Sequence, residues 1–200
     1  MNVKVEGHVK IIDTKTNEVL RDEYNAIHPG NMAIAIARGL ANSPNGDSYI
    51  YKLKLGNQGT YINSSQEIEF RPPNVLGMDA DLYNPTYVEV VDEEDSAVGS
   101  GNSVVHIATP ASTETRVVIT AVISANEAIN NPTDGGDGDA QLDPEGQFFF
   151  DELGLFTRET TGTLLEGADE LMLSHLIFSP IEHTGNRELT IVYSLLISVS

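Results

Sequence analysis

The most regular pattern in the sequence occupies residues 189–199, where large apolar side chains alternate with other residues. The alternating apolar positions are Leu189, Ile191, Tyr193, Leu195, Ile197 and Val199. Because successive side chains of a strand point to opposite faces, this pattern predicts a strand of about ten residues. We expect other strands on both sides of it, since an exposed edge of that length would be prone to aggregation.

Several shorter segments also carry strand patterns, with turn residues between them. We expect a hairpin over residues 3–24 and strands at 49–55, 87–91, 104–107, 115–124, 148–155 and 171–178. The spacing favours a mainly β fold, an antiparallel β-sandwich formed by a single domain over residues 1–200. Long loops are expected at 56–86 and 126–146, and the first is long enough that we expect it to contact something, such as a neighbouring subunit.

One helix is predicted, at about residues 31–41. Asn31 is the best candidate for its N-cap, and Met32, Ile36 and Leu40 recur every four residues. This spacing forms one apolar face, and alanines at 33, 35, 37 and 41 would allow it to approach a sheet closely. We therefore expect the helix to pack on the sheet through Met32, Ile36 and Leu40.

The charge balance excludes several classes of function. The chain has 11 basic and 30 acidic residues and a net charge of −19. Such a charge repels nucleic acid phosphates and disfavours anionic membrane surfaces. The chain has no cysteine, which excludes disulfides and zinc–thiolate sites. No apolar run is long enough to span a bilayer, and the first residues do not resemble a secretory signal.

An acidic, glycine-rich segment carries the only candidate metal ligands, Asp134, Asp137 and Asp139. Calcium prefers several carboxylates on a flexible backbone. The segment lacks the full D-x-D-x-D-G spacing and the closing Glu of a calcium loop, so a solvated loop is the favoured interpretation. No metal or other cofactor is therefore predicted.

The stretch 148–156 (FFFDELGLF) places two adjacent carboxylates among large apolar residues. We interpret it as a strand buried on both sides that leads into a corner. There Asp151 would accept backbone N–H groups, as in an Asx-turn, and Gly154 would allow an unusual backbone conformation. Glu152 is expected to point outward. A catalytic acid pair would also need a pocket and a partner base, which the sequence does not indicate.

Motifs of catalysis are missing from the sequence. It contains no G-x-S-x-G, no P-loop and no G-x-G-x-x-G after a strand. The five histidines lack the spacing of a zinc site; His8 and His106 fall in strands, and His175 in an apolar run where a hydrogen-bonded core histidine is expected. The prediction is a protein that is not an enzyme, with a hydrolase as the least favoured alternative.

Several motifs, in this order, resemble virion structural proteins of tailed bacteriophages. They are similar in outline to the N-terminal modules that attach tail fibres and collar proteins to the particle. The matching stretches are 25–28 (NAIH), 31–32 (NM), 55–57 (LGN), 59–60 (GT), 150–155 (FDELGL), 174–178 (SHLIF) and 189–193 (LTIVY). The sequence departs from the fibre pattern because no receptor-binding shaft follows the last strand and because it carries the polar segment 126–146.

The resemblance implies a non-enzymatic structural component at the tail, neck, collar or baseplate of a virion, assembled in the host cytoplasm. It implies contacts with other virion proteins and with copies of itself, in a symmetric assembly, and no contact with nucleic acid or membrane. A capsid decoration protein remains an alternative. A carbohydrate- or calcium-binding recognition domain is another, since Asn, Asp and Tyr in loops suit sugar hydroxyls.

Overall fold

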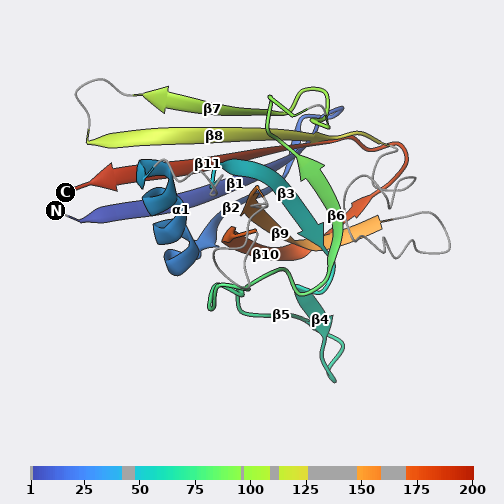
Figure 1. Ribbon diagram of the computed structural model, residues 1–200. Helices are drawn as coiled ribbons and strands as arrows, with labels where there is room; N and C mark the ends of the chain where they lie inside the picture. Colours follow the sequence, from blue (N-terminus) through green and yellow to red (C-terminus); the bar gives the residue numbers. More distant parts are fainter. Residues whose placement is uncertain (1, 42–47, 96, 109–112, 126–147, 159–169) are drawn as a thin grey trace.

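The computed structural model describes residues 2–41, 48–95, 97–108, 113–125, 148–158 and 170–200 (Figure 1). In these residues it confirms the mainly β fold with a single helix. The elements are β1 (Val3–Asp13), β2 (Glu18–Ile27), α1 (Pro29–Ala41), β3 (Ile50–Gly56), β4 (Thr60–Ile62), β5 (Ile68–Phe70), β6 (Pro85–Val90), β7 (Ser103–Ala108), β8 (Glu114–Ile123), β9 (Phe148–Thr157), β10 (Met172–His183) and β11 (Leu189–Val199). The described helix is too short to cross a membrane.

Nine of the strands form one antiparallel sheet in the order β6-β3-β9-β10-β2-β1-β11-β8-β7. The expected C-terminal strand is confirmed as β11, which lies between β1 and β8. Its register pairs Tyr193 with Val9 on one side and Ile119 on the other, and all three side chains are fully buried. The hairpin predicted for residues 3–24 is confirmed as β1 and β2.

The sheet curls, so that residues from both of its halves enclose one core. Strand β2 links the halves because its first part pairs with β1 and its last two residues pair with β10. Near the two ends of the sheet, Asn102 connects β6 to β8: its Nδ2 donates to the Val90 carbonyl at 2.8 Å, and its Oδ1 accepts the N–H of Val122 at 2.7 Å. All nine strands share one hydrogen-bonded sheet, so a sandwich of two separate sheets is not confirmed.

The helix packs against the sheet with a different side from the one that the sequence predicts. It begins at Pro29, and its cap is His28, whose Nδ1 accepts the N–H of Asn31 at 3.0 Å; the predicted cap at Asn31 is therefore wrong. Met32 and Ala35 are buried, whereas Ile36 is 38% and Leu40 84% exposed. The apolar side predicted from the four-residue spacing is wrong because Asn31 lies on the buried side of the helix. There its Nδ2 donates to the Met172 carbonyl at 3.1 Å.

The predicted loop at 56–86 contains regular structure. Strands β4 and β5 pair as a two-stranded hairpin that projects away from the main sheet, and β6 begins at Pro85 (Figure 1). A hairpin of this size is marginal in water on its own, so the sheet must hold it in place. The other predicted loop, 126–146, lies outside the described residues.

Candidate interaction site

The acid pair of β9 lies beneath the segment that leads to the hairpin. Asp151 accepts the backbone N–H groups of Gly59 and Thr60, both at 2.8 Å, and the hydroxyl of Thr60. The donors are more than 90 residues away in the sequence. Asp151 therefore fixes the first residues of β4, where the hairpin leaves the sheet.

The segment 57–84, which leaves the sheet after β3, forms the hairpin and returns at β6, is called the excursion below. Glu152 holds its other end. Its Oε1 accepts the N–H of Asn84 at 2.9 Å, and its Oε2 accepts the N–H of Tyr83 at 2.9 Å. The residue is fully buried, so the expectation that it points outward is wrong. Burial raises the pKa of Glu152, but hydrogen bonds from His175, Tyr83 and Asn84 outweigh this and keep its pKa below the ordinary value.

His175 is the third buried anchor, and its neighbours determine its tautomer. Its Nδ1 accepts the N–H of Asn74 at 2.9 Å, so the proton of the neutral ring lies on Nε2. That Nε2 donates to Glu152 Oε2 at 3.1 Å. The histidine is fully buried and hydrogen-bonded, as the sequence predicted for a core residue, and it attaches residue 74 to the sheet.

A second set of contacts holds the middle of the excursion. His28 Nε2 donates to the Gly77 carbonyl at 2.8 Å, while its Nδ1 caps the helix. Lys54 forms an ion pair with Asp81 at 3.1 Å and with Glu170 at 3.0 Å. The lysines of β3 are thus enclosed by partners, since Lys52 is only 8% exposed and meets Glu170 at 2.8 Å.

The stretch 148–156 does not form the predicted corner. Asp151 and Gly154 both lie inside β9, where Gly154 pairs with His175 on one side and Lys54 on the other. The positive φ angles of described glycines occur at Gly77 and Gly101, not at Gly154. A Cβ at Gly154 would lie 2.5 Å from the Phe156 ring, so glycine is required there for space.

Two other glycines allow the excursion to pass over the acid pair. A Cβ at Gly56 would lie 2.5 Å from both Glu152 Oε1 and the Asn84 carbonyl. A Cβ at Gly59 would lie 2.9 Å from the Asp151 carbonyl and 3.0 Å from the Glu152 side chain. The sequence LGNQG at 55–59 is therefore a signal for close packing against a strand, although it does not say which strand.

The hairpin that these contacts hold exposes four large apolar side chains. Ile62 is 68%, Ile68 53%, Phe70 52% and Tyr61 44% exposed. Ile62 pairs with Ile68, and Phe70 pairs with Thr60, so these side chains share one face, while Tyr61 and Glu69 share the other. Tyr61 also donates its hydroxyl to Glu69, and the guanidinium of Arg71 lies 5.8 Å from the Tyr61 ring centroid.

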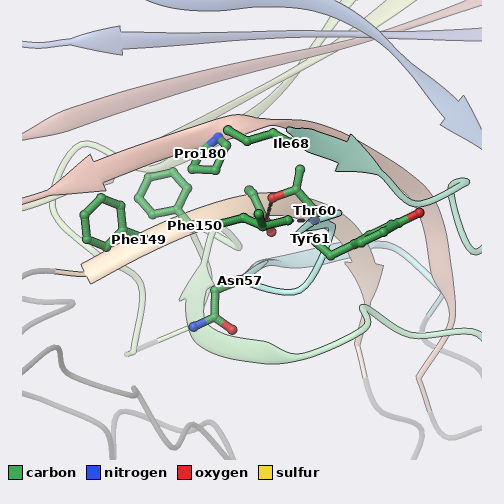
Figure 2. A pocket seen from close by; sticks show the side chains of 9 residues that line it. Asn57, Thr60, Tyr61, Ile68, Phe149, Phe150 and Pro180 are labelled. Atoms are coloured by element: carbon green, nitrogen blue, oxygen red, sulfur yellow. Dashed lines mark hydrogen bonds between the residues drawn. The ribbon is translucent and has the colours of Figure 1, made fainter. Parts of the chain in front are cut away.

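A groove runs between this hairpin and the strands β9 and β10. Figure 2 shows Ile68 and Pro180 at one side of it, Phe149 and Phe150 at another, and Asn57 and Tyr61 around the rest. Phe149 is 42% exposed whereas Phe150 is 1% exposed, so the prediction that both faces of this strand are buried is wrong. We call the exposed apolar side chains of the hairpin and Phe149 the hairpin surface; it comprises Ile62, Ile68 and Phe70 on one face of the hairpin, Tyr61 on the other face, and Phe149.

The ionisable groups of this arrangement are all hydrogen-bonded within the protein. Glu152 and His175 form an acid–base pair, but both are fully buried, and their oxygens and nitrogens bind backbone donors or each other. A general base must reach the proton that it removes from a substrate. The geometry shows an anchoring function for this pair.

The remaining site predictions have separate outcomes. The candidate calcium ligands Asp134, Asp137 and Asp139 lie outside the described residues. Within the described part of the chain, no group of three or more His, Asp or Glu residues could hold a metal ion. His8 lies 2.7 Å from Asp22, and His106 lies 2.7 Å from the hydroxyl of Thr115, so both have hydrogen-bonding partners in their strands.

Comparisons with known proteins give no relative. No protein-family model matches the chain, and neither a curated protein nor a solved structure matches it.

Proposed function

We propose that this chain is a non-enzymatic structural subunit of a phage virion, located at the tail, neck, collar or baseplate. Its work is done by contacts between folded surfaces. The observation that carries the proposal is the hairpin surface: four large apolar side chains are exposed on a hairpin that buried anchors hold in one position. The motif resemblance to virion proteins supports the same function.

Apolar side chains that are exposed and held in a fixed position favour the interpretation of the hairpin as a binding site. Exposed apolar surface is costly in water, and a contiguous patch of it is typical of a contact site. The anchors reduce the entropy that the hairpin would lose on binding, which increases the affinity for a partner. Asp151, Glu152 and His175 thus contribute to binding although no partner touches them.

The charges of the hairpin indicate what kind of partner it contacts. Residues 60–70 contain Glu67 and Glu69 and no basic residue, and one arginine, Arg71, follows directly, with its guanidinium 5.8 Å from the Tyr61 ring centroid. We expect a neighbouring virion protein with an apolar depression surrounded by Lys or Arg, since such a surface complements the hairpin in both respects.

The test uses purified chain and the products of the genes that neighbour it. We expect one of these virion proteins to bind the wild-type chain, and Ile62→Glu to weaken the binding by about 10- to 100-fold, because one buried Ile side chain contributes about 1.5–3 kcal/mol. Val19→Glu is the matched control, since Val19 is 48% exposed on β2, outside the β4–β5 hairpin. The proposal fails if no neighbouring product binds and if mass spectrometry does not detect the chain in purified particles.

One observation favours carbohydrate recognition as a second candidate function. A groove on the outer face of the sheet is lined by Glu6, His8, Tyr24, Arg116, Ser194 and Leu196, and Tyr24 is 76% exposed. An exposed aromatic ring beside hydrogen-bonding groups suits a sugar. Calorimetry with a glycan panel tests this function, and binding that is lost in Tyr24→Ala would favour it over a purely structural function.

A further inference from the structure

The outer face of α1 is a second exposed apolar surface, at a different place from the hairpin (Figure 1). Ala33, Ile36, Ala37 and Leu40 are all exposed. Their spacing of three, four and seven residues places them along one side of the helix. This is the spacing by which a helix packs on another element, yet among the described residues this side is uncovered.

The sheet beside the helix extends this apolar surface. Val3 and Val5 lie on the same face of β1 as the core residues Val9 and Ile11, because side chains two residues apart share a face. A groove between β1 and α1 is lined by Val3, Val5, Ile27, Pro29, Met32, Ala33 and Ile36. Val3 is 54% exposed, and its partner Val199 is 36% exposed. We call this groove together with the outer side of α1 the helix surface.

The helix surface lacks the charge that dominates the rest of the chain. The sequence 29–41 contains no Asp or Glu, although the chain has 30 such residues, and its only charged residue is Arg38. The charged residues of β1 near the groove, Lys4 and Glu6, lie on the opposite face of the strand and pair with each other at 2.9 Å. Every residue that lines the groove has an apolar side chain.

This absence of acids decides which partner fits. Two copies of a chain with a net charge of −19 repel each other wherever their carboxylates approach. An acid-free apolar surface is where two copies can meet with the least repulsion and the largest burial of apolar area. A basic partner would gain nothing from this surface and would be attracted to the acidic faces instead.

We propose that the helix surface binds a second copy of this chain, with the two α1 helices facing each other across a two-fold axis. In such a contact the same patch serves both copies. The helix of 13 residues is short, so its outer side alone is a small interface; the groove with Val3 and Val5 enlarges it. We expect a dissociation constant of about 1–100 µM, because small interfaces are weak or transient and even those of standard size can be as weak as micromolar. This inference specifies the partner for one contact of the proposed structural function and rests on that function.

The first experiment measures association by sedimentation velocity of the full chain over about 1–100 µM. Wild type is expected to dimerise. Leu40→Glu is expected to weaken the dimer at least tenfold, because it places a carboxylate on the contact of two acidic copies. Since Leu40 is 84% exposed, the variant should fold normally, which circular dichroism and the melting temperature check. Ile62→Glu is the control with the same added charge on the hairpin, and it should dimerise like wild type.

The second experiment tests whether two α1 helices face each other. Ala37 is exposed near the centre of the apolar side, so its counterpart in the other copy should be close to it. Ala37→Glu alone and Ala37→Lys alone should each weaken self-association, and an equimolar mixture of the two should associate more tightly than either. A mixture that associates no better than the separate variants contradicts the two-fold arrangement.

The outcomes separate this inference from the proposed function. A wild-type monomer over the whole range, or a dimer that Leu40→Glu leaves unchanged, overturns the helix contact, and so does a helix surface that binds a different virion protein. None of these results affects the hairpin, whose binding to a neighbouring virion protein is measured separately. Conversely, loss of all virion binding with an intact α1 dimer overturns the function and leaves the helix contact in place.

Discussion

The hairpin surface and the helix surface expose similar side chains but differ in their support and in their charge. The hairpin leaves the sheet and depends on Asp151, Glu152 and His175 for its position. The helix packs directly on the sheet through Met32 and Ala35. The hairpin carries two glutamates, with Arg71 directly after it, whereas α1 carries one arginine and no acid.

This difference suggests how one acidic chain could bind a second copy through one surface and a basic partner through the other. Acids beside an apolar patch repel a second copy and attract a basic partner, whereas a patch without acids permits contact between copies. Apolar exposure alone would not distinguish the two surfaces. On our proposals, the position of the carboxylates is what gives each surface a different partner.

The largest expected effect comes from Glu152→Gln, which should release the hairpin surface and leave the helix surface intact. Both carboxylate oxygens accept N–H groups, so the amide nitrogen of Gln would face a donor whichever way it turned. We expect a loss of about 3 kcal/mol in the free energy of unfolding, since buried donors would lose their acceptor. Urea denaturation measures it.

Glu67→Gln is the control for this substitution, because Glu67 is an exposed carboxylate on the hairpin itself. It should unfold at the same urea concentration as wild type. In Glu152→Gln, proteolysis within residues 56–84 should become faster while α1-mediated dimerisation persists. Equal stability of Glu152→Gln and wild type would show that the acid pair does not anchor the excursion.

The same comparison shows what the sequence could and could not predict. The strand β11 and the hairpin β1–β2 were predicted, because their alternation is local and the curled sheet preserves it. The sequence wrongly predicts a corner at the acid pair, because the hydrogen-bond partners of Asp151 and Glu152 include Gly59 and Tyr83, which lie 92 and 69 residues away. No local pattern reports a contact at that separation.

The sequence does not predict the helix surface, for a related reason. Periodicity found an apolar side on α1, but it could not say which side the sheet would cover. Asn31 takes a buried position because the Met172 carbonyl accepts its side-chain N–H, and this turns Leu40 toward the solvent. A buried Asn on a helix is recognised only when its partner is known.

Acid should weaken the hairpin anchor more than the helix contact. The folded-state pKa of Glu152 lies below its ordinary value of 4.5, so its stabilising contribution is complete above that value and is lost as the pH falls through the lower, folded-state pKa. The difference in unfolding free energy between wild type and Glu152→Gln should therefore shrink as the pH falls from about 6 through the lowered pKa of Glu152. Urea denaturation at several pH values measures this difference. A difference that stays constant or grows would show that Glu152 is not the group that loses its function in acid.

The smallest expected effect, salt dependence, distinguishes the two surfaces by its sign. Raising the salt concentration from about 50 to 500 mM shortens the distance over which charges act to a few Å. Self-association through the acid-free helix surface should become a few-fold tighter, since the repulsion between two copies with a charge of −19 is screened. Binding of the hairpin surface to a basic-rimmed partner should become a few-fold weaker, because the attraction to Glu67 and Glu69 is screened. Sedimentation velocity measures the first equilibrium and calorimetry the second, both on wild-type chain. Two dependences of the same sign would show that the carboxylates do not determine which partner each surface binds.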